Sequence, residues 1–405
     1  MFVYNINKDV FQVHNNYIKD LLGFKDVIVK KVTNEKDSVW IEIATKQKEV
    51  ICPRCSSLTS KIHDYRTQVI KDMPIQFKNT FLVLRKRRYV CKCCGKKFLE
   101  DLEFLPKYYR MTSRLSCWIY EQLLSITSIS KIAKTANVSS NTVFRILSLF
   151  NVSNNSLPEV LSIDEFKGNT GESKYQVALM DNVKGHVLDI LPSRKVHDLC
   201  EYFKKFPLAE RRKVKYFVTD MWEDYKGIAM TYFPNARVVA DRFHFVRYAC
   251  KALDEIRIRV QKNVPKKTRK YIKGSKKLLL ARPFNLNPKG LERVSHILHN
   301  FHDDLRVSYL LKEQLLDIAK LHSPALAKKL FIEWIDSAEA TDIPELVACA
   351  KTYRNWFVEI VNSFEVPFNN GVIEGTNNKI KALKRMAFGF RNFFNFRTRI
   401  LLCTK

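Results

Sequence analysis

The sequence is poor in glycine and in acidic residues, and it has no long apolar run. Glycine occurs only 11 times in 405 residues, and no glycine-rich phosphate-binding motif is present. These absences argue against nucleotide-driven chemistry and against a Rossmann cofactor site. No stretch of about 18 apolar residues occurs, so no segment is expected to cross a bilayer. The first residues show no basic stretch followed by an apolar one, so we expect no secretory signal and a cytoplasmic protein.

What the chain has in excess is positive charge. Lysine and arginine total 70 against 41 acidic residues, which gives a formal net charge of +29. Such an imbalance indicates a polyanionic partner, either nucleic acid or an anionic membrane surface. Hydrophobic residues make up 46% of the chain, which is typical of globular proteins. Because no membrane signal accompanies the charge, we expect nucleic acid as the partner and no membrane.

The apolar pattern predicts a mixed α+β protein with several domains. A helical stretch from about Thr112 to Phe150 is followed by a polar linker, Asn151–Pro158. A helical run, His197–Phe206, and a long basic helical region from Phe243 to about Val361 come later. The apolar segments between the linker and that region predict short strands at Val160–Ile163, Tyr175–Met180, His186–Leu191, Val214–Thr219 and Arg237–Ala240.

Five of the ten cysteines lie close together near the start of the chain. Four of them form two C-x-x-C pairs: Cys52, Cys55, Cys91 and Cys94. Two such pairs supply four thiolates to one tetrahedral ion, so we expect a zinc ribbon with structural Zn²⁺. Cys93 is an alternative to Cys94, and His63 is a less favoured fourth ligand. The remaining alternative is a set of reduced cysteines without a metal.

The segment Ser128–Leu147 has the pattern of a helix-turn-helix motif. Asn137 falls where the turn needs a left-handed residue, and Ser139 or Ser140 can cap the second helix. The alternative is a simple helical hairpin. If the motif binds DNA, the outward residues of its second helix would contact bases or phosphates: Ser140, Asn141, Thr142 and Arg145.

Three aspartates, Asp164, Asp220 and Asp241, each end a short apolar strand. A charge at the end of a buried strand is costly unless it binds a cation or a partner. Two carboxylates at the ends of neighbouring strands can share a divalent ion. These aspartates are therefore candidate metal ligands.

Glu374 lies in a different setting, on a predicted amphipathic helix. It shares a polar stripe with Lys381 and Arg385, and no acidic residue follows it in the chain. A lone glutamate on a cationic face is either an ion-pair partner or a metal ligand beside a phosphate backbone. We expect Lys381 and Arg385 to bind DNA in either case.

Four motifs in this order resemble a known family. They are Ser162–Gly168, Thr219–Trp222, Ala240–Val246, and Asn370–Lys381 followed by Gly389–Asn392. Behind the cysteine pairs and the helix-turn-helix, they resemble the ISL-three type of bacterial insertion-sequence transposase over nearly the whole chain.

The resemblance implies an RNase H-like catalytic domain with a DDE triad. By motif, the triad residues are Asp164, Asp220 and Glu374, and Asp241 is the alternative to Asp220 as second ligand. The cofactor implied is Mg²⁺ (or Mn²⁺), with two-metal phosphoryl transfer as the mechanism. The partners implied are double-stranded DNA, as terminal inverted repeats and as target, and further copies of the chain in a homodimer or larger assembly.

The predicted function is therefore metal-dependent DNA cleavage and strand transfer by a nucleoid-associated enzyme. The alternatives are a catalytically inactive DNA-binding regulator and an RNase H-like nuclease that cuts without joining. The predicted segments are an N-terminal region with the zinc ribbon (1–108), the helix-turn-helix (109–152), the first part of the RNase H-like core (159–250), a basic helical insertion (251–365), and the catalytic helix with its tail (366–405).

Overall fold

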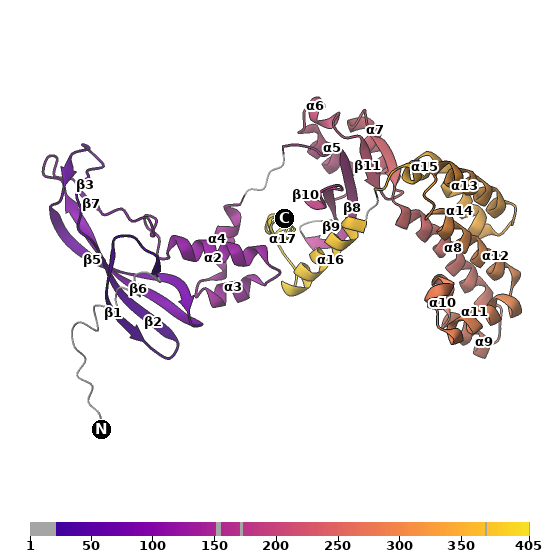
Figure 1. Cartoon of the computed structure of the whole chain (residues 1–405), viewed down its shortest axis with the longest axis horizontal. Helices are drawn as coiled ribbons and strands as arrows, with labels where there is room; N and C mark the ends of the chain where they lie inside the picture. The colour runs from indigo at the N-terminus through magenta and orange to yellow at the C-terminus, as the bar shows by residue number, and fades with distance from the viewer. Residues whose placement is uncertain (1–21, 151–154, 171–172, 369–370, 405) are drawn as a thin grey trace, which may run out of the picture. The chain divides into compact units, whose positions relative to one another are not determined.

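The computed structural model describes residues 22–150, 155–170, 173–368 and 371–404 (Figure 1). The chain forms two compact units. The first contains residues 22–150 together with Leu383–Phe388 and Phe394–Cys403, and the second contains the intervening residues and Gly389–Phe393. The predicted segment 366–405 is thus divided between the units. The predicted linker at 151–158 lies partly outside the described residues, as does the N-terminal stretch examined for a secretory signal.

The first unit is built on a twisted sheet with the order β1-β2-β6-β5, in which β7 also pairs with β6. Its buried face packs Ile41, Ile70 and Leu82 against Phe24 and Leu105. A separate two-stranded pair, β3 and β4, carries the first cysteine pair. The strands are β1 (Val27–Asn34), β2 (Ser38–Thr45), β3 (Val50–Ile51), β4 (Leu58–Thr59), β5 (Ile62–Ile75), β6 (Lys78–Val90) and β7 (Lys97–Leu99).

Helices complete the first unit: α2 (Ser113–Leu124), α3 (Ile129–Thr135), α4 (Ser140–Ser148) and α17 (Phe393–Cys403). Thr112 caps α2 and also donates a hydrogen bond to the buried Asp72 of β5 (2.7 Å), which fixes this helix against the sheet. The core of α2–α4 includes Leu402 from α17. Arg399 of α17 is fully buried and donates to three carbonyl oxygens in the α2–α3 region, those of Leu123, Ser125 and Thr127.

The second unit contains a mixed sheet in the order β10-β9-β8-β11-β12. The first three strands are antiparallel, while β11 lies parallel to both β8 and β12. All five predicted strands are confirmed, but β8 continues seven residues beyond Ile163. The strands are β8 (Val160–Thr170), β9 (Ser173–Asp181), β10 (His186–Leu191), β11 (Tyr216–Thr219) and β12 (Arg237–Ala240).

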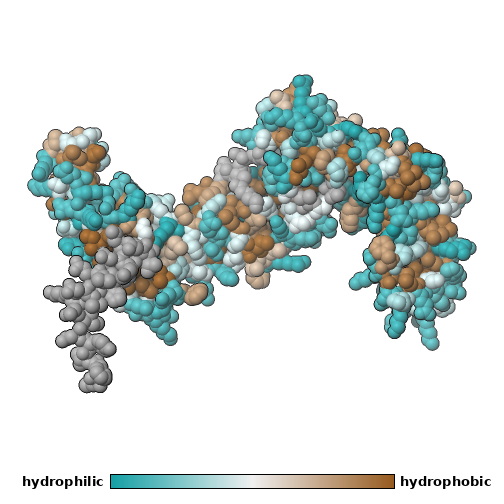
Figure 2. Space-filling view, viewed as in Figure 1, coloured by the Kyte–Doolittle hydropathy of each residue, from teal (hydrophilic) through white to brown (hydrophobic). Residues whose placement is uncertain are grey.

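Aromatic packing joins this sheet to α5 (Val196–Lys204) and α7 (Glu223–Tyr232), with the short α6 (Leu208–Arg211) beside them. Phe203 of α5 stacks edge-on against Phe233, which also contacts Phe217 of β11. The sheet side chains on this face are buried in the same core. By contrast, α6 buries none of its residues, and the surface around it is largely hydrophilic (Figure 2).

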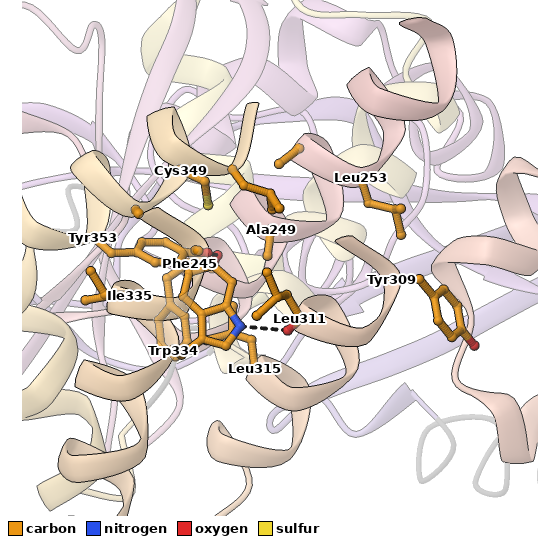
Figure 3. Close-up of a cluster of buried hydrophobic side chains, with 14 of the residues drawn as sticks. Phe245, Ala249, Leu253, Tyr309, Leu311, Leu315, Trp334, Ile335, Cys349 and Tyr353 are labelled. Carbon is orange, nitrogen blue, oxygen red and sulfur yellow. Dashed lines mark hydrogen bonds between the residues drawn. The ribbon is translucent and has the colours of Figure 1, made fainter. Parts of the chain in front are cut away.

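A bundle of helices is inserted between β12 and α16 (Gly371–Met386), as the basic helical pattern predicts. Its core is aromatic: Trp334 donates to the carbonyl oxygen of Leu311 (2.7 Å) and packs beside Tyr353 (Figure 3). The bundle returns to the sheet through α15, where Asn362 donates to the carbonyl oxygen of Val238 (2.8 Å). Its members are α8 (Arg242–Lys262), α9 (Lys266–Lys273), α10 (Lys276–Leu280), η1 (Pro283–Asn285), α11 (Pro288–Asn300), α12 (Asp303–Ile318), α13 (Pro324–Glu339), α14 (Pro344–Asn355) and α15 (Phe357–Glu365).

Among the described residues, no helix combines the length and the apolar character that crossing a membrane requires.

Candidate active site and metal centres

Strand register in the second unit aligns three aspartates. Val218 of β11 pairs with Ser162 of β8, and Thr219 pairs with Ala240 of β12. Asp220 and Asp164 each lie two residues after the paired Val218 and Ser162. Asp241 lies one residue after Ala240. Since parallel strands present their carboxyl ends at one edge, these side chains gather there.

Asp164, Asp220 and His244 form one cluster at this edge. Each offers a ligand atom, and these atoms all lie within 4.8 Å of one another. His244 lies in the first turn of α8, the helix that begins directly after Asp241. Two carboxylates and an imidazole in this spacing can hold a divalent cation.

Burial changes the protonation behaviour of the two aspartates. Burial raises the pKa of Asp164 to about 6, and the neighbouring Asp220 adds to the rise. Burial also raises the pKa of Asp220. Both carboxylates therefore hold protons more tightly than usual, because burial disfavours their charged forms.

One part of the sequence interpretation is wrong about Asp164. The residue was expected to end its strand, but β8 runs on to Thr170, and Asp164 pairs with Ala178 in mid-strand. The strand continues because Phe166 and Lys167 pair with β9 in the same ladder. Asp164 still lies at the edge of the sheet formed by the parallel strands, because β11 is much shorter.

Asp241, the alternative second ligand, lies behind the cluster. Only 2% of its surface is exposed. Its Oδ2 is 2.8 Å from Nδ1 of His244, and its amide donates to the carbonyl oxygen of Thr219. The choice between Asp220 and Asp241 as a ligand stays a prediction, but in this geometry Asp220 faces Asp164 and Asp241 faces the histidine.

Helix α16 contributes an asparagine to the site. Asn377 Nδ2 donates to Asp164 Oδ2 (2.9 Å), while its own Oδ1 is buried without a hydrogen-bond partner in the described structure. Glu374 lies three residues earlier, exposed, and is not part of the described cluster. Its catalytic role therefore remains a prediction.

A cationic stack borders the cluster. Arg194 donates to Glu165 Oε2 (2.7 Å), so the carboxylate next to Asp164 pairs with an arginine. The same guanidinium lies 4.8 Å from the ring centres of both Tyr175 and Trp222. Because Trp222 follows Asp220 by two residues, this stack places positive charge and an aromatic surface beside the aspartates.

The residues at the edge fit a resident divalent cation. Two largely buried carboxylates, an imidazole and the orphaned amide oxygen of Asn377 together offer the donor atoms that such an ion takes. Tyr225 adds a second buried oxygen without a partner among the described residues, and burial together with Asp220 raises the pKa of its hydroxyl well above the usual range.

In the first unit, the four predicted cysteines converge. Cys52 and Cys94 are 3.6 Å apart at their sulfur atoms, and Cys55 and Cys91 are 3.5 Å apart. A zinc ion bound by four thiolates at 2.3 Å would set the sulfurs about 3.8 Å apart. The four residues therefore fit structural zinc.

Cys93 and His63 stay outside this zinc cluster, which favours Cys94 over the two alternatives. Cys93 is exposed, and His63 lies near Asp64 instead. The hydroxyl of Ser57, 3.5 Å from the sulfur of Cys55, lowers the pKa of that thiol to about 6 together with the Ser57 amide.

The predicted DNA-contacting residues of α4 lie on its outer side. Asn137 adopts φ 51° at the preceding turn, and Ser139 caps α4 by accepting from the amide of Thr142 (3.2 Å). Arg145 donates to the Thr142 hydroxyl. Ser140, Asn141 and Arg145 are exposed and Thr142 is half-buried, and Lys381 and Arg385 are exposed on α16.

Sequence reasoning missed Asn377 and gave His244 no definite role. Asn377 lies four residues after Ile373 and three before Ile380, both buried. That spacing places it on the inward side of α16, so it could have been found. His244 follows Asp241 by three residues at a helix start, which is the spacing that lets the two side chains meet.

Two family models of transposases match this chain. A family model of ISL3 transposases, described as a transposase, matches residues 161–400. A model of the zinc-finger of transposases IS204, IS1001, IS1096 and IS1165 matches residues 48–94. The matched ranges contain the acidic cluster and the four cysteines respectively.

Individual relatives extend this similarity. The transposase for insertion sequence element IS1001 from Bordetella parapertussis is 27% identical over 386 residues, covering 93% of this chain and 94% of that protein. The transposase for element IS1557 from Mycobacterium tuberculosis is 25% identical over 244 residues, 54% of each chain. An ATP-dependent protease from Lactococcus lactis subsp. lactis is 42% identical over 52 residues, but these cover only 13% of this chain.

Proposed function

This chain belongs to the ISL3 family of insertion-sequence transposases, and we propose that it cuts the ends of its own element and joins them to target DNA. The observation that carries the proposal is the cluster of Asp164 and Asp220 at the carboxyl edge of the second sheet. As an enzyme of a bacterial insertion sequence, it would act on chromosomal DNA in the cytoplasm.

We assign the second sheet to an RNase H-like catalytic domain. Three antiparallel strands, a helix and a parallel strand leading to Asp220 follow the order that the family implies. The helices α8–α15 are then an insertion before α16. Glu374 is the third acidic residue of the proposed triad, since it matches the family motif and lies one helical turn from Asn377.

Chemically, the site is suited to phosphoryl transfer by metal ions. Mg²⁺ or Mn²⁺, when bound, supplies Lewis-acid activation of water and charge stabilisation of the leaving 3′ oxygen. Asp164 and Asp220 would hold the metal, while Asn377 orients Asp164. Arg194, with its guanidinium partly exposed beside the cluster, would bind a neighbouring phosphate.

We assign α3 and α4 to a helix-turn-helix that reads the terminal repeats. The support is the left-handed Asn137 at the turn and the exposed polar face of α4. The zinc ribbon beside it would then be part of the DNA-binding unit. Binding of paired ends calls for at least a homodimer.

The test is a cleavage and strand-transfer assay with Mg²⁺ or Mn²⁺ on DNA that carries the element ends. We compare wild type with Asp164→Asn, Asp220→Asn, Asp241→Asn and Glu374→Gln. The exposed Asp224 of α7 provides a matched control, Asp224→Asn. We expect the 164, 220 and 374 variants to lose activity by at least about a hundredfold while still binding the ends.

Three results would change the assignment. A wild type that binds the ends but never cuts them supports the regulator. Cutting without joining supports the nuclease. An active Asp220→Asn beside an inactive Asp241→Asn would move the second ligand to Asp241.

A further inference from the structure

His244 is held in a way that leaves one ring nitrogen for the acidic cluster. Its Nδ1 is 2.8 Å from Asp241 Oδ2, so Nε2 is the nitrogen still available to an ion. The ligand atoms of His244, Asp164 and Asp220 lie within 4.8 Å of one another. A carboxylate that binds one nitrogen of a histidine fixes its tautomer and orientation for metal binding through the other.

The position of Asp241 suits this supporting role. Its carboxylate is almost fully buried, and it starts the helix that carries His244. The amide of His244 donates to the carbonyl oxygen of Asp241 (3.0 Å), so backbone and side chain both tie the two residues together. The histidine ring is only 24% exposed and stacks edge-on with Phe243. Its orientation is therefore set before any ion arrives.

A second observation points to an ion at the same place. Asn377 is 92% buried, since only 8% of it is exposed, and its Oδ1 has no hydrogen-bond partner in the described structure. Its Nδ2 contacts Asp164, so the orphaned oxygen lies beside the cluster as well. A buried amide oxygen without a partner is costly, and a cation held by Asp164 would satisfy it.

We propose that His244, oriented by Asp241, is a ligand of the catalytic metal and gives the site a preference for Mn²⁺ over Mg²⁺. The proposal rests on the proposed function, because it adds a nitrogen donor to the same metal site. Mg²⁺ is bound almost only through oxygen. Mn²⁺ also favours carboxylates, but as a softer first-row ion it tolerates an imidazole donor better than Mg²⁺ does. The assigned roles are therefore ligand for His244 and positioning residue for Asp241.

The test measures metal binding without DNA and without turnover. Mn²⁺ alone is titrated into the full-length protein with zinc already bound, and affinity is followed by electron paramagnetic resonance. We expect His244→Ala and His244→Gln each to weaken Mn²⁺ binding by at least about tenfold, and Asp241→Asn by about tenfold. Mg²⁺ binding, measured by competition, should weaken less.

Pulsed resonance supplies a signature that a merely structural role would not change. Wild type should show coupling of Mn²⁺ to an imidazole nitrogen, and both His244 variants should lose it. Asp241→Asn should weaken it while the protein still melts near the wild-type temperature. The exposed His197 of α5 is the matched control, and His197→Ala should keep both affinity and coupling.

The outcomes separate this inference from the proposed function. If Asp164→Asn abolishes Mn²⁺ binding but the His244 variants bind like wild type without losing nitrogen coupling, the histidine is not a ligand and the catalytic assignment stands. If wild type binds no Mn²⁺ at all and Asp164→Asn cuts DNA normally, both fall.

Discussion

Two residues at equivalent places in the cysteine pairs adopt a left-handed backbone. Ser56 has φ 58° and Gly95 has φ 68°, and each donates its amide to the carbonyl oxygen of the first cysteine of its pair. Glycine takes this conformation without cost, whereas serine does not. The first pair thus uses a residue that its geometry disfavours.

We predict that Ser56→Gly stabilises the zinc-bound first unit by about 0.5–1 kcal/mol, because it removes this conformational cost. Gly95→Ser should destabilise it by a similar amount, since a Cβ there meets nothing within 4 Å and only the backbone angle matters. Chemical unfolding, followed by release of zinc to a coloured chelator, measures both. Equal stability of the two variants would contradict the explanation.

The acidic cluster predicts a pH-dependent cost of folding when the divalent metal is absent. Burial raises the folded-state pKa of Asp164 to about 6 from an ordinary value of 3.8. A raised carboxyl pKa stabilises the folded state fully below the ordinary value, and this stability is lost as pH rises through the folded value. The loss of folding stability therefore develops between about pH 4 and 6, and it is complete above about pH 6.

Asp164→Asn removes the charge, so we expect it to stabilise the protein free of divalent metal by about 2 kcal/mol at pH 7.5, and by almost nothing at pH 4. Thermal unfolding at several pH values measures the difference. Excess Mn²⁺ should restore the advantage to wild type, which binds it. A gain that is the same at both pH values would mean that the cause is packing and not charge.

At the scale of elements, the buried Arg399 side chain attaches α17 to the end of α2 and the segment that follows it. The Arg399 guanidinium donates to the carbonyl oxygens of Ser125 (3.0 Å) and Thr127 (2.8 Å) and to that of Leu123. Burial lowers the pKa of this arginine, but three carbonyl oxygens near the end of α2 surround it. Each oxygen would lose this charged donor if the side chain were removed, although Ser125 would still accept from the amide of Thr127 (2.9 Å).

Arg399→Met keeps the apolar part of the side chain but removes three hydrogen bonds from a buried guanidinium, so we expect a loss of about 3 kcal/mol in stability of the first unit. Urea unfolding measures it, and binding to the element ends should weaken in parallel. Arg391→Ala, at an exposed arginine before α17, is the control for stability. A stable Arg399→Met that still binds DNA would show that α17 is dispensable there.

Sequence patterns could predict elements better than they could predict contacts. Short apolar segments located every strand of the second sheet, and C-x-x-C spacing located the four cysteines that converge. The length of β8 was missed, because the residues after Asp164 are held by pairing with β9, which a local pattern does not record. The contact between Asn377 and Asp164 spans 213 residues in sequence and depends on tertiary packing.

At the scale of the whole molecule, the two units take their residues from different parts of the chain. The second unit is assembled almost entirely from residues 155–382, whereas the first also takes residues from beyond 383. Family resemblance located the motifs that we propose to be catalytic, but it gave no reason to expect α17 in the core of the first unit. That placement depends on the burial of Leu402 and Arg399. The sequence pattern of a short amphipathic helix does not predict which core such residues join.

Because Arg399 and Leu402 come after all the other elements in sequence, the core of α2–α4 is completed late in synthesis. A ribosome translates the sheet that carries Asp164 and Asp220, and α16 with Asn377, before α17 exists to fill the core of α2–α4. A chain that stops early therefore has an open core in the very unit that we propose to hold the element ends. Interrupted translation would release fragments that compete poorly for those ends, so occupancy of the DNA would be reserved for chains that already carry the residues we propose to be catalytic.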